Sequence, residues 1–339
     1  MIRRKVGLAM IAWMSWTVIG AAACAGGEAL AEQPLVEPRS AAGGSGSTPA
    51  MRHGDPSIFQ AKDDLRILYM LLRLRKDTIQ DDMRIVNALR QADWFTHVFL
   101  IVMSWQERPD APRNPIVKHA LTICHERGIK VIWGRWLWVA WPSDKLEAPM
   151  PVADSHFDSA YYATAIATLK AEARSLGAVG TFLDAEPYGH CAQKPTLKFK
   201  KLDDDDRRRI QSAVARAVAN VGPVDFIYPT SSARASHYAW PLAGLGRLRC
   251  DSKTYYSTQP DQVPKIRSPK GYEHRMNLWG CNVGLGRPQD HMKGQRKLTI
   301  KDVKSLDLSL IRKDYPHCKG VWVYADTSIL AKVVEAFKN

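Results

Sequence analysis

The sequence predicts an α/β protein and, within that class, a single-domain (β/α)₈ barrel. Two observations carry this prediction. After residue 58, apolar runs of strand length alternate with segments whose apolar residues recur every three or four positions, and eight such runs occur before residue 339. In addition, no G-x-G-x-x-G motif follows the first run, which counts against the alternative of a doubly wound open sheet.

The expected strands are short apolar runs, most of them rich in β-branched or aromatic residues. They cover residues 66–72, 97–103, 130–138, 180–186, 225–231, 253–257, 276–283 and 320–326. The sixth of these has the weakest strand pattern. Because the active site of a (β/α)₈ barrel is built at the carboxyl ends of its strands, the residues that end each run are the first candidates for function.

The expected helices show apolar residues on one face and charged residues between them. They cover residues 78–92, 114–127, 159–176, 203–220, 299–311 and 328–338. Gly128 and Gly177 end two of them, as glycine does at helix C-termini. Thr299 and Asp302 have the spacing of a capping box at the start of another.

The first 57 residues precede the expected barrel of residues 58–339. Residues 1–31 have the order of a secretory signal peptide: three cations at 3–5, an apolar run, and small residues at its end. We therefore expect an exported protein, periplasmic or extracellular, with no membrane span after processing. The alternatives are an uncleaved membrane anchor and lipidation of Cys24, since residues 21–24 resemble a lipoprotein box. Residues 32–57, rich in Gly, Ser, Pro and Ala, predict a flexible linker.

Composition excludes several classes of protein. With 45% hydrophobic and 24% charged residues, the chain is neither collagenous, disordered nor wholly membrane-embedded. The six cysteines form no CxxC pair, so a zinc knuckle is not expected, and Cys124 and Cys281 fit buried positions in a helix and a strand. P-loop, G-x-S-x-G and H-E-x-x-H motifs are absent. We expect no cofactor and no metal.

The net charge of +14 raises the question of an anionic partner. The pattern of a helix-turn-helix, an aromatic RNA-binding motif or a zinc finger is absent, so nucleic acid is not expected. Cations follow the fourth and seventh strands, at the end of the barrel where a site is expected: Lys198, Lys200, Lys201, Arg287, Lys293, Arg296 and Lys297. They suggest an acidic or sulfated polysaccharide as ligand, the alternative being an ordinary solvated surface.

The strongest candidate for chemistry is a pair of carboxylates, Asp184 and Glu186, at the end of the fourth strand. Residues two apart on a strand share a face, so both side chains are expected in the barrel mouth. A protonated carboxylic acid beside an ionised one is what glycosidic cleavage requires. The pair could instead hold a divalent cation, but no further ligands are evident at neighbouring strand ends.

The segment 180–186, Gly-Thr-Phe-Leu-Asp-Ala-Glu, resembles the end of the D-G-x-D-x-D-x-E motif of family 18 glycoside hydrolases, the chitinase-like barrels. Gly180, Asp184 and Glu186 match, whereas Val179 and Phe182 stand where the motif has its first two acids. The resemblance implies that Glu186 is the proton donor and that Asp184 orients the attacking group. It also implies a tyrosine near the end of strand six and a tryptophan on strand eight, for which Tyr256 and Trp322 are available.

Aromatic and polar residues near the strand ends are candidates for binding sugar rings, whose C–H faces stack on flat aromatic surfaces. In residues 130–138, Trp136 and Trp138 alternate with Trp133 and Arg135, so one set is expected in the mouth and the other under the helices. On the eighth strand, Trp322, Tyr324 and Asp326 are expected inside, with Asp326 as a reserve second carboxylate. The candidate binding residues are Trp105, Glu107, Arg135, Trp136, Tyr188, Tyr228, Tyr256, Trp279, Trp322, Tyr324 and Asp326.

These observations favour an exported glycoside hydrolase that cleaves O-glycosidic bonds of a poly- or oligosaccharide by carboxylate acid/base catalysis. The alternative is a degenerate, non-catalytic barrel that binds glycan through the same aromatic cleft.

Overall fold

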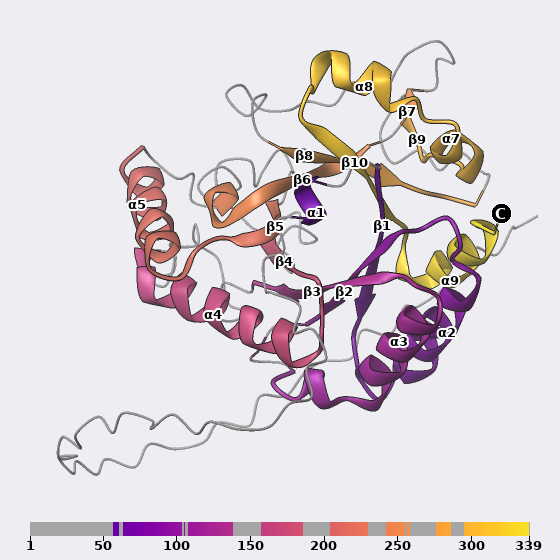
Figure 1. Cartoon of the computed structure of the whole chain (residues 1–339), viewed down its shortest axis with the longest axis horizontal. Helices are drawn as coiled ribbons and strands as arrows, with labels where there is room; N and C mark the ends of the chain where they lie inside the picture. The colour runs from indigo at the N-terminus through magenta and orange to yellow at the C-terminus, as the bar shows by residue number, and fades with distance from the viewer. Residues whose placement is uncertain are drawn as a thin grey trace, which may run out of the picture. The chain divides into compact units, whose positions relative to one another are not determined.

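A computed structural model describes residues 57–60, 64–103, 105, 108–137, 157–185, 204–229, 242–254, 256–257, 276–285 and 295–338. Eight parallel strands form a closed barrel in the order β1-β10-β8-β6-β5-β4-β3-β2 (Figure 1). The predicted (β/α)₈ barrel is confirmed. Its strands are β1 (Leu65–Leu72), β2 (His97–Val102), β3 (Lys130–Trp136), β4 (Gly180–Ala185), β5 (Val224–Pro229), β6 (Gly246–Thr254), β8 (Asn277–Asn282) and β10 (Cys318–Tyr324).

Helices surround the barrel, with α2, α3 and α9 side by side on one flank and α4 beside α5 on another (Figure 1). The described helices are α1 (Ser57–Gln60), α2 (Ile79–Ala88), α3 (Pro115–Glu126), α4 (Ser159–Ser175), α5 (Asp204–Val221), α7 (Ile300–Lys304), α8 (Leu308–Asp314) and α9 (Thr327–Ala336). In the described part of the chain, no helix has the length and apolar character needed to cross a bilayer.

The predicted helix starts and stops are confirmed where capping chemistry defined them. Gly128 and Gly177 adopt φ values of +68° and +65° after α3 and α4, a conformation that costs glycine little. The Thr299 side chain accepts a hydrogen bond from the Asp302 N–H, and the Asp302 side chain accepts one from the Thr299 N–H. This reciprocal capping box fixes the start of α7.

Two predicted elements were wrong in extent. The single helix expected at 299–311 is two helices, because the Asp307 side chain accepts a hydrogen bond from the Ser309 N–H and starts α8 anew. The sixth barrel strand, expected at 253–257, is β6 and begins at Gly246. Its many charged residues hide the apolar alternation on which the prediction relied. Tyr256–Ser257 instead forms β7, which pairs antiparallel with β9 (Gln295–Arg296) outside the barrel sheet.

Side chains sort into two apolar clusters according to the face of the strand from which they point. The larger cluster lies between strands and helices and includes Val321 and Val323, as the sequence predicted. The smaller one fills the barrel. Its buried members are Ile58, Leu65, Ile67, Tyr69, Phe99, Ile101, Ile132, Phe182, Phe226, Tyr228, Leu248, Cys250, Leu278 and Trp322.

The barrel closes tightly where β1 meets β10. Gly320 pairs with Leu65 and has a φ of +146°. A Cβ atom at this position would lie 2.1 Å from the Leu65 carbonyl oxygen, so only glycine permits this approach of the two strands. At the amino-terminal end of the strands, the Ile58 side chain of α1 lies next to Gly180, where a Cβ atom would be 3.2 Å from its Cδ1 atom. Phe59 packs on Phe226 with ring centroids 5.6 Å apart. Helix α1 therefore contacts the interior cluster.

Candidate active site

Asp184 lies at the centre of a polar cluster inside the barrel. The residue is fully buried near the end of β4. Its Oδ2 atom accepts a hydrogen bond of 2.5 Å from the Tyr69 hydroxyl on β1 and one of 2.7 Å from the Trp136 indole N–H on β3. Three strands thus contribute to one carboxylate, and two donors on a single oxygen stabilise its negative charge.

The two donors also contact one another. The Trp136 N–H lies 3.3 Å from the Tyr69 hydroxyl oxygen, so Tyr69 accepts from Trp136 while it donates to Asp184. The backbone adds a further bond, because the Leu137 N–H donates to the Asp184 carbonyl oxygen at 2.8 Å. The end of β3 is therefore fixed against the end of β4 by both side chain and main chain, which restricts the rotamers of the Asp184 carboxylate.

Aromatic rings from two other strands, β5 and β10, lie next to this cluster. Tyr69 lies 5.6 Å from Trp322 and 5.2 Å from Tyr324, measured between ring centroids, and Tyr228 lies 5.1 Å from Trp322. The structure thus brings Trp136, Tyr228, Trp322 and Tyr324 together with Asp184, on the inner face of the barrel. Trp322 is fully buried, whereas Trp136 and Tyr324 are only partly buried. The last two rings are therefore the more accessible to a ligand.

Arg135 does not join this group, and its assignment to a substrate site is corrected. It points to the helix layer, where Nε and Nη2 bind the Glu172 carboxylate of α4 at 2.9 and 2.7 Å. Its Nη1 donates to the carbonyl oxygens of Met103 and Arg108 at 3.0 and 2.7 Å. All three guanidinium nitrogens therefore donate to protein groups, and the side chain is fully buried.

Trp105 and Trp279 also lie on the helix-facing side. The Arg135 guanidinium sits 5.5 Å from the centroid of the Trp105 ring, and Trp105 packs against the cluster between strands and helices. Trp279 belongs to the same cluster and lies 6.3 Å from the Tyr315 ring. The expectation that these two indoles line the mouth was therefore wrong. Strand alternation turns Trp279 of β8 outward, and Trp105, which lies beyond the end of β2, packs against the cluster between strands and helices.

Asp326, the reserve carboxylate, forms an ion pair with Lys297. The Lys297 side chain is 3% exposed and the Asp326 side chain 50% exposed. Lys297 was expected among the solvated cations of the rim, and its burial corrects that expectation. Its aliphatic stem packs on Gly284, where a Cβ would lie 3.2 Å from the Cβ of Lys297. The methylene stem of a lysine can be buried against apolar groups when its ammonium group is paired with a carboxylate.

Four predicted residues cannot be placed in the site by their side chains. Glu186, Glu107 and Tyr188 lie outside the described residues, and for Tyr256 only the backbone of β7 is described. That backbone follows the end of β6 at Thr254 by two residues and pairs outside the barrel sheet.

Sequence reasoning missed Tyr69. Its signal was present: apart from Arg66, Tyr69 is the one polar-tipped residue of β1, and it lies two positions from Ile67 on the interior face. A buried tyrosine hydroxyl needs a partner, and a carboxylate at the same depth of the barrel supplies one.

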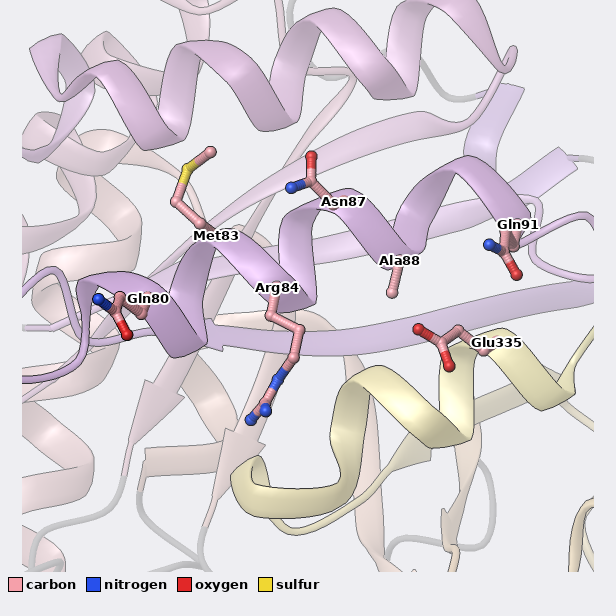
Figure 2. Close-up of a pocket in the computed structure, with 7 residues that line it drawn as sticks. All are labelled: Gln80, Met83, Arg84, Asn87, Ala88, Gln91 and Glu335. Atoms are coloured by element: carbon pink, nitrogen blue, oxygen red, sulfur yellow. The ribbon is translucent and has the colours of Figure 1, made fainter.

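Other candidate sites are few among the described residues. No group of three or more His, Cys, Asp or Glu side chains there is placed to hold a metal ion. A groove of about 460 Å³ lies on the outside of the barrel between α2 and α9 (Figure 2). It is lined by Gln80, Met83, Arg84, Asn87, Ala88, Gln91 and Glu335. These are mostly surface side chains from two outer helices, remote from Asp184 in the fold.

Comparison with known proteins finds similarity in structure alone. No family model and no curated protein sequence matches the chain. A family 18 chitinase from Pseudoalteromonas aurantia has 13% identity and a TM-score of 0.43, with 80% of this chain and 98% of that chain covered. A family 18 chitinase from Cycas revoluta, solved with (GlcNAc)3, has 11% identity and a TM-score of 0.39, with 80% and 99% covered.

A D-psicose 3-epimerase from Clostridium cellulolyticum H10 is similar to the same degree, with 12% identity, a TM-score of 0.40, and 80% and 96% of the two chains covered. The solved barrels that resemble this chain therefore include chitinases of family 18, the family that the strand motif resembles, together with an enzyme of another class. At these identities and TM-scores the likeness concerns the barrel and carries no argument about the reaction.

Proposed function

We propose that this protein is a glycoside hydrolase in which Asp184 and Glu186 act on a poly- or oligosaccharide bound in the mouth of the barrel. The observation that carries the proposal is the immobilised Asp184 carboxylate, which accepts hydrogen bonds from Tyr69 and Trp136 next to further aromatic rings. Burying a carboxylate costs free energy of folding even when donors from two other strands bind it. Such buried, hydrogen-bonded carboxylates are common in active sites.

The chemistry follows from two carboxyl groups with separate roles. Glu186 would donate a proton to the glycosidic oxygen as the C–O bond breaks, and water would supply the atoms that complete hydrolysis. Asp184 would support the positive charge that develops on the sugar ring or orient the attacking group. Tyr69 and Trp136 hold its Oδ2 atom, so the carboxylate needs little reorganisation as that charge develops.

One observation favours the second candidate, a barrel that binds glycan without cleaving it. Phe182 stands where the resembling motif has an acid, and it stacks on Phe99 with ring centroids 4.3 Å apart inside the barrel. The barrel interior is therefore apolar at the position where the resembling motif has a further carboxylate. The difference between the candidates is therefore whether Glu186 with Asp184 suffices for proton transfer.

A panel of neutral and anionic oligosaccharides separates the two candidates. We expect the wild type to release new reducing ends from at least one glycan. Glu186→Gln should lower that rate about 100-fold or more, with glycan affinity retained in calorimetry. Glu126→Gln, which changes an exposed carboxylate at the end of α3, is the matched control and should leave the rate unchanged. Glycans that bind to the wild type without being cleaved would establish the binding module instead.

Export is part of the proposal, because the substrate would be met outside the cytoplasm. Edman sequencing of the mature protein tests it. Cleavage after Ala31 is expected for an ordinary signal peptide, and a blocked or lipidated Cys24 for the lipoprotein alternative.

A further inference from the structure

The loop between β1 and α2, residues 73–78, brings cations to the carboxyl end of the strand that carries Tyr69. Leu72 and Leu74 both lie in the cluster between strands and helices. Arg73 lies between them and directly follows Leu72, the last residue of β1. Arg73 and Lys76 are exposed. Arg73 follows Tyr69 by four residues, which is at most roughly 13 Å along a strand.

This loop is held rigidly by Asp82 of α2, which is fully buried. The Asp82 carboxylate accepts hydrogen bonds from the N–H groups of Leu74 at 2.8 Å and Arg73 at 3.3 Å. It accepts a third from the Thr78 hydroxyl at 3.3 Å. Thr78 in turn binds the Arg75 backbone, with its N–H donating to the Arg75 carbonyl oxygen at 3.0 Å. Asp82 and Thr78 together thus fix the main chain of the residues that carry the cations.

Holding the loop in this form costs free energy. Leu74 has a φ of +55°, and it is the one non-glycine with positive φ in the described part of the chain. A leucine in the left-handed region is strained because its Cβ lies too close to the following carbonyl oxygen, and Asp82 loses its hydration on burial. In folded proteins, strained residues are found mainly at binding and catalytic sites. Fixed cations also bind anions better than mobile ones, since less conformational entropy is lost.

The charge balance on this side of the mouth is positive. The loop contains Arg73, Arg75 and Lys76 against the single acid Asp77. Asp326, which follows the end of the neighbouring strand β10, already pairs with the buried Lys297. An anion that approaches Tyr69 from the β1 side would therefore meet a net positive rim.

We propose that the loop at residues 73–78 is a subsite for carboxylate or sulfate groups, and that the substrate is an anionic polysaccharide. The inference rests on the proposed function for its choice of polysaccharide, but the subsite itself does not require cleavage. Arg73 offers a planar fork that matches a carboxylate or sulfate, and Lys76 supplies a second, adjustable charge.

The test measures binding by calorimetry in the Glu186→Gln background, which keeps ligands intact. The probes are oligogalacturonate and its fully methyl-esterified, neutral form. The variant Arg73→Gln/Lys76→Gln removes two cations from the loop. Its matched control, Lys118→Gln/Lys332→Gln, removes two exposed cations from α3 and α9. Thermal unfolding of each variant verifies that the barrel is intact.

We expect the loop variant to lose about tenfold or more in affinity for oligogalacturonate, with a shallower salt dependence, and the control to change less than about twofold. Affinity for the neutral ester should be lower in the wild type and the same in both variants. Asp82→Asn, which loosens the loop while its cations remain, should also weaken binding of oligogalacturonate.

Three results would overturn the proposal: equal losses in the loop variant and the control, equal affinity of the wild type for the charged and neutral probes, or an equal loss in binding of single-stranded DNA, which would mark an unspecific polyanion surface. Loss of hydrolysis in every assay, with the binding difference intact, would refute the proposed function and leave the subsite standing.

Discussion

The Tyr69 hydroxyl donates to the Asp184 carboxylate across the barrel interior, joining β1 to β4, which are not neighbours in the sheet. The bond of 2.5 Å spans 115 positions of the sequence. It exists because both residues occupy inward positions at a similar depth, with Gly134 and Phe182 below them as filling. A contact of this kind links the closure of the barrel to the geometry of the candidate site.

Tyr69→Phe should separate the role of this bond in catalysis from its role in folding. Asp184 keeps the Trp136 N–H as a donor, so we expect a loss of about 1–2 kcal/mol in the free energy of unfolding. If cleavage occurs, kcat/KM should fall about 10- to 100-fold. Urea denaturation and steady-state kinetics measure the two effects. Tyr162→Phe removes a buried hydroxyl in the helix layer and should change stability alone; an equal fall in kcat/KM there would contradict a special role for Tyr69.

Arg135 is expected to matter for stability and not for ligand contact. Arg135→Met leaves the largely buried Glu172 carboxylate without its bidentate partner and frees two carbonyl oxygens. We expect a loss of about 3–5 kcal/mol. The double variant Arg135→Met/Glu172→Met should recover part of that loss, because no buried charge remains unpaired. Chemical denaturation measures both, and a glycan affinity that falls in the folded double variant would speak for a ligand contact after all.

Much of the fold could be predicted from the sequence because each signal was local. Apolar runs such as 97–103 identify strands, and Gly128 and Gly177 mark helix ends through their backbone freedom. The direction of Trp322 and Tyr324 followed from the valines between them. Failures occurred where the deciding contact was not local. Arg135 faces α4 because Glu172, 37 residues away, is its partner, and β6 is a strand because β5 and β8 flank it.

The closure of the barrel at Gly320 gives a sharp prediction about stability. Gly320→Ala would place a Cβ 2.1 Å from the Leu65 carbonyl oxygen and 2.6 Å from its nitrogen, so backbone must move. We expect a loss of about 3 kcal/mol or more in the free energy of unfolding. Gly128→Ala is the control, since its φ is also positive but no atom lies within 4 Å. It should cost about 1–2 kcal/mol. Similar losses in both variants would show that contact at Gly320 is not the cause.

His97 predicts a dependence of stability on pH. Burial, with a smaller contribution from Lys130, lowers the pKa of His97 to about 4. In the unfolded chain the imidazole takes up a proton near pH 6.5, so between about pH 6.5 and 4 the unfolded state binds more protons than the folded one. Stability should therefore fall as the pH drops through this window, by up to about 3 kcal/mol.

Comparison of the wild type with His97→Gln isolates this contribution. Asp82 acts in the opposite sense, because burial raises its pKa and the folded state then holds a proton that the unfolded state has lost. Asp82 is present in both proteins, so the difference between their unfolding free energies from pH 7 to pH 4.5 reports His97. Parallel curves would contradict the assignment.

The central claim is that a glycan is bound with its reacting ring over Asp184, Tyr69 and Trp136. The most direct measurement is a crystal structure of Glu186→Gln with a bound oligosaccharide. The account predicts a sugar ring in the barrel mouth, within hydrogen-bonding distance of Asp184 or Tyr69 and stacked on Trp136 or Tyr324. An oligosaccharide found on the outer helices, for instance in the groove between α2 and α9, with the mouth empty, would contradict it.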